Sequence, residues 1–112
     1  MANHYKIISS FYNVEKWIRR TLLSVKHQNY DNFQCVLIDD VSTDNTVNIV
    51  KDQIKDDDRF ILIENKKKKY SLENISAALN SLEADKDDIV VFLDGDDWFA
   101  HGRVLSSLNK VY

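Results

Sequence analysis

Three aspartates gathered within four positions, Asp94, Asp96 and Asp97, are the residues best suited to chemistry in this chain. Like charges this close repel one another unless they are solvated, hydrogen-bonded or bridged by a cation, which points to a divalent metal. Hard carboxylate oxygens suit Mg²⁺ or Mn²⁺, and such a site leaves coordination positions for substrate phosphates. The alternative is a solvated Asp-Gly turn, because turns prefer Asp and Gly.

Other polar turns follow apolar runs earlier in the chain. Ser9 and Ser10 close the first run, and Asp39 and Asp40 close the second. Residues 66–69 are four consecutive lysines after the third run. Such a cluster is most simply a solvated turn, and the functional alternative is that one lysine reaches an anionic ligand.

The elements that must position these residues alternate in type. Apolar runs at residues 5–9, 33–38, 60–63 and 89–93 are typical of strands, and the last predicts a strand covered on both faces. Helical patterns follow each strand, with apolar positions near residues 14–25, 47–54, 72–82 and 104–112. We expect Asn13 to cap the first helix, Glu15 to lie in its first turn, and Trp17 to lie on its apolar stripe.

This order predicts an α/β fold, with Rossmann-like alternating strand-helix units and a mostly parallel sheet. All strands of a parallel sheet point the same way, so the polar turns at their carboxyl ends meet at one edge. Open α/β sheets bind ligands at this edge. The acidic and polar turns are therefore expected to form a single site for a nucleotide or sugar nucleotide, with its diphosphate bridged to the metal.

Length and composition exclude several classes of protein. The 112 residues predict one domain, residues 1–112. A net charge of -3 argues against a nucleic-acid partner. No apolar stretch approaches the roughly 18 to 20 residues of a membrane span. The single Cys35 is expected to be buried, and it fits a reducing compartment, for which we expect the cytoplasm.

Other acidic sites fit the spacing less well. A calcium loop that starts at Asp40 would place Asn45 where Gly is needed and Lys51 where a bidentate Glu belongs. A receiver domain would need its acidic pair after the first strand. A haloacid-dehalogenase-type phosphatase would need a Thr where Trp98 stands. The chain has no Gly-rich phosphate loop and no Cys/His zinc set.

Three segments resemble successive signatures of family 2 glycosyltransferases with the GT-A fold. They are IISSFYNVEKWI at residues 7–18, LIDDVSTDNT at residues 37–46 and FLDGDDW at residues 92–98. The resemblance covers essentially the whole chain, with three motifs in the expected order. It implies a truncated GT-A domain that binds a nucleotide-sugar donor for inverting transfer to the hydroxyl of a saccharide or another acceptor.

The resemblance also implies roles for individual residues. Ser10 and Asp40 would line the pocket of the nucleotide base. Asp94 would contact the ribose and, with Asp96 and Asp97, the divalent metal. Lys69 is the candidate for a further nucleotide contact, in a loop that lacks the family's usual Gly and Arg-Asn elements. A UDP-sugar is the favoured donor. For the oligomeric state, a homo-oligomer is kept as an alternative to a monomer.

The general base of the family is not visible in this chain. Family members continue beyond this length and supply there the Asp or Glu that deprotonates the acceptor hydroxyl, whereas residues 100–112 contain no acid. We therefore expect the nucleotide-sugar-binding half of an enzyme, as a fragment or a naturally short chain. The alternatives are a binding module without turnover and, less favoured, a receiver-like signalling domain.

Overall fold

The computed structural model describes residues 4–69, 73, 89–93 and 105. Its elements are β1 (Tyr5–Phe11), α1 (Ile18–Lys26), β2 (Phe33–Asp39), α2 (Thr46–Ile54), β3 (Phe60–Glu64) and β4 (Ile89–Phe92). From β1 to β3, strands and helices alternate as predicted. Most of the predicted helices near residues 72–82 and 104–112 lies outside the described residues. Glu73 and Leu105, which are described, are helical.

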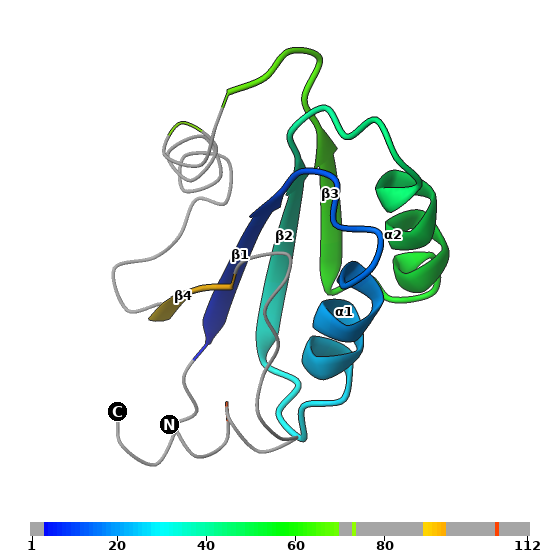
Figure 1. The fold of residues 1–112 in the computed structure, drawn as a ribbon. Coiled ribbons are helices and arrows are strands. Elements are labelled where there is room, and N and C mark those ends of the chain that lie inside the picture. The colour runs from blue at the N-terminus through cyan, green and yellow to red at the C-terminus, as the bar shows by residue number, and fades with distance from the viewer. Residues whose placement is uncertain (1–3, 70–72, 74–88, 94–104, 106–112) are drawn as a thin grey trace.

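The four strands form one sheet in the order β3-β2-β1-β4, and every neighbouring pair is parallel. Phe11, Asp39 and Glu64 lie side by side across the register of β1, β2 and β3. The carboxyl ends of these three strands therefore share one edge, seen at the arrowheads in Figure 1. This confirms the predicted α/β fold with a parallel sheet.

The order of the strands reverses between β1 and β4. The chain moves from β1 outward through β2 to β3, and β4 then lies on the opposite side of β1. In open α/β sheets, ligands bind outside the carboxyl ends of the strands at such a switch point. The fold therefore indicates a ligand site near the carboxyl ends of β1 and β4.

Alternation along the strands builds two cores on the two faces of the sheet. On the face covered by α1 and α2, Ile7 and Leu37 pack with the helix residues Leu22 and Val50 (Figure 1). The other face holds a smaller cluster centred on Ile8, Val36 and Ile38. Ser10 follows Ile8 by two positions in β1, so it lies on the face away from the two helices.

The prediction that the last strand, β4, is covered on both faces was wrong at Phe92. The side chain of Phe92 is 55% exposed, and Val90 and Val91 are only partly buried. Within the described residues, β4 pairs with β1 alone and forms the border of the sheet. An apolar run therefore indicated the strand correctly but overstated its burial.

Helix α1 starts later than predicted. Its N-cap is Trp17 and its first turn contains no acid, so Asn13 is not the cap and Glu15 precedes the helix. The N–H groups of Trp17 and Ile18 both donate to the carbonyl oxygen of Val14, which makes residues 14–17 a turn. Trp17 is 44% exposed rather than part of the buried stripe.

The remainder of the α1 stripe and the cysteine behave as predicted. Ile18, Thr21, Leu22 and Val25 are buried on the sheet side of the helix. Cys35 is buried, and desolvation raises the pKa of its thiol, which keeps the thiol protonated and unreactive. No helix in the described part of the chain is long and apolar enough to cross a membrane.

Candidate functional site

Backbone hydrogen bonds hold the strand ends together at the carboxyl edge. The N–H of Asp40 donates to the carbonyl of Phe11 at 2.9 Å, and the N–H of Asn65 donates to the carbonyl of Asp39, also at 2.9 Å. On the other side of β1, the N–H of Leu93 donates to the carbonyl of Ile8 at 3.0 Å. Leu93, the last described residue before the acidic stretch in the sequence, therefore lies directly beside β1.

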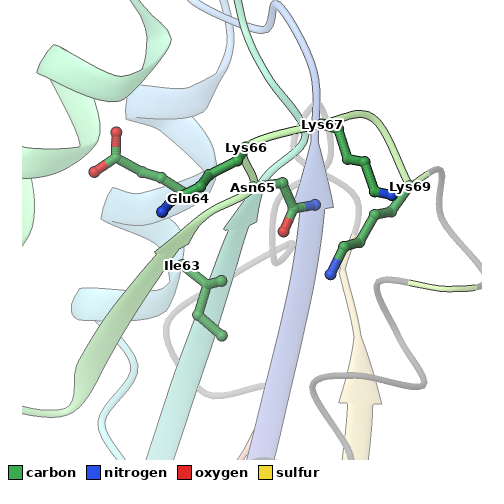
Figure 2. A pocket seen from close by; sticks show the side chains of 6 residues that line it. All are labelled: Ile63, Glu64, Asn65, Lys66, Lys67 and Lys69. Atoms are coloured by element: carbon green, nitrogen blue, oxygen red, sulfur yellow. The ribbon is translucent and has the colours of Figure 1, made fainter.

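The carboxylate of Asp40 is the centre of the contacts at this edge. Asp40 is only 4% exposed. Its Oδ1 accepts hydrogen bonds from Asn65 Nδ2 at 3.1 Å and from the backbone N–H of Lys69 at 2.8 Å. Both donors belong to the loop of residues 65–69, which we call the β3 loop and which is drawn in Figure 2. The buried charge is thus compensated by donors, as burial requires.

The β3 loop also reaches across to the loop that follows β1. The Nζ of Lys68 lies 3.1 Å from the ring centroid of Tyr12, a cation–π contact. Tyr12 is 43% exposed and stands two residues after Ser10. The β3 loop therefore joins the ends of three strands into one surface.

Asn13 connects the loops that follow β1 and β2. Its Oδ1 accepts the backbone N–H of Thr43 at 2.8 Å, and its Nδ2 donates to the Thr43 hydroxyl at 3.2 Å. Its own N–H donates to the hydroxyl of Ser42 at 3.0 Å. Asn13 has a φ of 51°, a conformation that Asn tolerates better than most residues.

Val41 also has a positive φ, 65°, immediately after Asp40. A β-branched residue is a genuine outlier in this region, with a cost of about 1–3 kcal/mol, and such strain clusters at functional sites. The strained turn lets the N–H of Ser42 donate to Asp39 Oδ2 at 3.1 Å. The strain therefore supports a role for this edge beyond folding.

Two buried polar atoms on the helix side of the edge lack a hydrogen-bond partner within the described structure, Ser9 Oγ and Asp39 Oδ1. Ser9 is 1% exposed and Asp39 is 3% exposed. Native proteins leave few such atoms unsatisfied, because each costs about 1–3 kcal/mol. Their position at the ends of β1 and β2 marks the same edge as the contacts of Asp40.

Hydrogen bonds also set the charge state of Asp44, in the loop after β2. Burial acts to raise its pKa, but the hydrogen bonds that its carboxylate accepts from Thr46 and from the N–H of Glu15 outweigh burial and lower the pKa. Asp44 therefore stays ionised while it ties the start of α2 to the loop before α1.

The structure brings together part of the predicted site. Ser10, half-buried, and Asp40 lie at the ends of neighbouring strands, and Lys69 joins Asp40 through its backbone. Asp94, Asp96 and Asp97, the predicted metal ligands, lie outside the described residues. Among the residues that are described, no group of three His, Cys, Asp or Glu side chains could hold a metal ion.

Sequence reasoning missed two residues that organise this edge. Asn65 has no role in the sequence-based prediction, yet its amide donates to Asp40. Asn13 was predicted to cap a helix, yet its side chain binds Thr43, which lies thirty positions away. The position of Asn65 directly after a strand could have indicated its role at this edge. The role of Asn13 could not be found in this way, because its partner Thr43 is distant in the sequence.

Comparison with known proteins identifies the family. The sequence profile described as Glycosyl transferase family 2 matches residues 6–111. A glycosyltransferase of Haemophilus influenzae is 35% identical over 104 residues, which are 92% of this chain and 40% of that protein. Glycosyltransferase GlyA of Streptococcus pneumoniae is 33% identical over 106 residues, which are 94% of this chain and 14% of that protein. The chain thus spans less than half the length of these curated relatives.

Solved structures of glycosyltransferases share the fold. S. aureus TarS, in a crystal structure of its residues 1–349 with UDP, superposes with a TM-score of 0.79 at 25% identity, over 94% of this chain and 30% of that one. The mannosyltransferase PcManGT of Pyrobaculum calidifontis, in complex with GDP-Man and Mn²⁺, gives a TM-score of 0.82 at 23% identity. That match covers 99% of this chain and 32% of the mannosyltransferase, and it supports the fold alone.

The parallel sheet, the polar edge built around Asp40 and the match of the family profile over nearly all of the sequence agree with one another. This chain belongs to glycosyl transferase family 2.

Proposed function

We propose that this chain binds the nucleotide-sugar donor of a glycosyltransferase at the carboxyl edge of its sheet. The observation that carries the proposal is the reversal of strand order between β1 and β4, at the place where the polar ends of β1 and β2 also lie. Ligands of open α/β sheets bind at such a point. Family membership supports the class of ligand, a nucleoside diphosphate sugar.

The nucleotide base would lie near the ends of β1 and β2. Ser10 and Asp40 are the proposed base contacts, and Lys69 is proposed as a further contact because its backbone already binds Asp40. The contacts of Asp40 with Asn65 and Lys69 fix the carboxylate in place, so that its position is set before a ligand arrives. We propose a UDP-sugar as donor, since S. aureus TarS binds UDP and UDP-GlcNAc.

The diphosphate would lie toward β4. Asp94, Asp96 and Asp97 are the proposed ligands of a Mg²⁺ or Mn²⁺ ion, because three carboxylates so close in sequence suit a hard divalent cation. The described residues support this arrangement in one respect: Leu93, which directly precedes position 94 in the sequence, is bonded to β1. When bound, the metal would act as a Lewis acid that neutralises charge on the departing nucleoside diphosphate.

The reaction of the whole protein is proposed to be an inverting transfer. An acceptor hydroxyl would displace the nucleoside diphosphate at the anomeric carbon while a general base accepts its proton. No residue of this chain is assigned as that base. We keep the cytoplasm as the proposed compartment, because the one cysteine is buried and free.

The test is a calorimetric titration of UDP with and without Mn²⁺. We expect binding that requires Mn²⁺ and that weakens at least about tenfold in Asp96→Ala, because one metal ligand is lost. Asp56→Ala removes an equal charge from an exposed position before β3 and should bind UDP normally. Binding of equal strength without metal, or no binding at all, would refute the proposal.

A second experiment separates an enzyme from a binding module. Release of free sugar from a UDP-sugar by the full chain with Mn²⁺, abolished in Asp96→Ala, would support catalysis. Metal-dependent UDP binding without any turnover would favour the binding module, the alternative from the sequence.

A further inference from the structure

Positive charge is concentrated at the start of helix α1. The buried residues of α1 pack toward the sheet, on the face that α2 also covers (Figure 1). Three cations at the start of the helix are exposed, Lys16, Arg19 and Arg20. Residues 16–30 contain no acid, although the whole chain has 18 acidic and 15 basic residues. The charge of this helix is therefore opposite in sign to the net charge of the chain.

These cations lie where a helix disfavours them. Arg19 and Arg20 are the second and third residues of α1, in a first turn that contains no acid. The N-terminus of a helix carries partial positive charge, so Asp and Glu are favoured there and cations are unfavourable. Trp17, the N-cap, forms no side-chain hydrogen bond that would compensate. Local rules broken without a structural gain are expected at functional surfaces.

Neighbouring acids do not neutralise this charge. Within the residues that the structure describes, no carboxylate forms a salt bridge with Lys16 or Arg19. Glu15, beside them in the sequence, is exposed and is not paired with either. By contrast, Lys51 in α2 and Lys55 at its C-cap each pair with a carboxylate, at 3.4 Å and 3.5 Å. The start of α1 thus differs from the mixed charge of α2.

An exposed tryptophan adjoins the cations. The side chain of Trp17 is 44% exposed and lies between Lys16 and the first turn of α1. Tryptophan is enriched where proteins meet the membrane–water interface, because its ring is apolar and its N–H is polar. We call Lys16, Trp17, Arg19 and Arg20 the α1 surface. It combines positive charge with one aromatic side chain suited to an interface.

We propose that the α1 surface docks the protein onto a membrane that contains anionic lipids. Negatively charged headgroups complement the three cations, and each Lys or Arg near such a surface strengthens binding about fivefold. Trp17 would lie at the level of the headgroups. The apolar side of α1 is packed on the sheet, so the helix would lie against the membrane without entering it.

A lipid surface fits these residues better than another polyanion does. Nucleic-acid-binding domains are usually basic as a whole, whereas this chain has a net charge of -3. An acidic peptide would match the cations but gives no reason for the exposed ring of Trp17. Docking is a property beyond the proposed donor binding and does not depend on it.

The test is co-sedimentation of the full chain with lipid vesicles. We expect binding to vesicles with phosphatidylglycerol, weaker binding as salt is added, and little binding to phosphatidylcholine alone. Lys16→Gln/Arg19→Gln should weaken binding at least about tenfold, because two cations are lost. The control Lys51→Gln/Lys55→Gln removes the same charge at α2 and should bind like the wild type.

Tryptophan fluorescence tests the contact of Trp17 itself. Emission should shift to shorter wavelength with the anionic vesicles, because the exposed ring leaves water. The shift should be absent from Trp17→Phe, which retains the second tryptophan, Trp98. A shift of equal size in Trp17→Phe would place another part of the chain at the membrane and overturn the proposal.

Urea denaturation separates docking from a structural role. Lys16→Gln/Arg19→Gln should unfold at the same or a higher urea concentration than the wild type, because the removed cations oppose the helix dipole. A lower midpoint would show that they serve the fold, and would overturn the proposal. Equal loss of vesicle binding in the control, no binding of the wild type, or binding to polyglutamate or DNA but not to vesicles would also overturn it.

The outcome is separable from that of the donor site. UDP binding with Mn²⁺ should be unchanged in Lys16→Gln/Arg19→Gln, because neither residue is a proposed donor contact. Vesicle binding without UDP binding would leave the docking surface standing and refute the donor site alone. Loss of UDP binding in this variant would refute a separate docking surface.

Discussion

Asp40 shows how a single buried carboxylate can organise a binding edge. Its side chain is almost entirely removed from water, and it accepts hydrogen bonds from Asn65 and Lys69. These donors fix the β3 loop over the end of β2. The same residue was predicted from its motif to contact a nucleotide base, so the proposed ligand contact and the loop anchor coincide.

Asn13 should contribute to stability through both its side chain and its backbone. Its amide joins two loops, and its φ of 51° favours Asn or Gly over Ala. We expect Asn13→Ala to lower the free energy of unfolding by about 2 kcal/mol, through lost hydrogen bonds and a strained backbone. Asn13→Gly should cost less, about 1 kcal/mol, since it removes only the side-chain contacts.

Urea denaturation of the two Asn13 variants separates these contributions. Equal losses in Asn13→Ala and Asn13→Gly would show that the backbone conformation is unimportant. No loss in either variant would show that the link to Thr43 does not stabilise the fold.

The contacts of single residues were predicted least well from the sequence, and Asn13 is the clearest case. Asn13 stands where a local pattern predicts a helix cap, because Asn is favoured there. The helix starts at Ile18 instead, and the amide binds Thr43 in another loop. A contact between distant positions is decided by how two loops pack, which local capping rules do not represent.

At the scale of elements, Arg59 joins the start of β2 to the start of β3. Its Nη2 and Nε atoms bind the two carboxylate oxygens of Asp57, at 2.7 Å and 2.9 Å. Its guanidinium lies 4.5 Å from the ring centroid of Phe33. Residues 56–58 are three consecutive aspartates, and Asp57 forms the ion pair with Arg59.

The pairing of Asp57 predicts a pH-dependent contribution to stability. The side-chain hydrogen bonds from Arg59 hold the pKa of Asp57 below its usual range. Since the pKa is lower in the folded state, this stabilisation is complete above the ordinary carboxyl pKa of about 3.9. It is lost as the pH falls through the lowered folded-state pKa.

We therefore expect Asp57→Asn to lower the free energy of unfolding by about 1 kcal/mol at neutral pH. The difference from wild type should shrink as the pH falls below the ordinary carboxyl range. Urea denaturation across this pH series measures both effects. Asp56→Asn, an exposed neighbour, is the matched control, and an equal loss in both variants would contradict the role of the Arg59 pair.

Strands were the elements best predicted from sequence. Each apolar run became a strand, because continuous Val, Ile, Leu and Phe suit a sheet that is buried on at least one face. Their burial was predicted less well, as the exposed Phe92 shows. Burial depends on which strand lies at a border, and strand order follows from tertiary packing rather than from the composition of any one run.

At the scale of the whole molecule, alternation of strands and helices predicted a parallel sheet with polar turns at one edge, and the sheet confirms it. The order β3-β2-β1-β4 was not predictable from the pattern, because alternation alone does not say on which side of β1 the last strand inserts. That order is what brings Leu93 beside β1, where its N–H donates to the carbonyl of Ile8. The proposed metal site depends on this placement.

The most direct test of the donor-site proposal is paramagnetic NMR of the chain with UDP and Mn²⁺. Manganese at the switch point should broaden the amide signals of Leu93, Ser10 and Asp40. It should spare Asn32 and Arg59, which precede β2 and β3 at the opposite edge. Broadening centred on Asn32 and Arg59, or no localised broadening, would contradict a metal-bridged donor site at the carboxyl edge of this sheet.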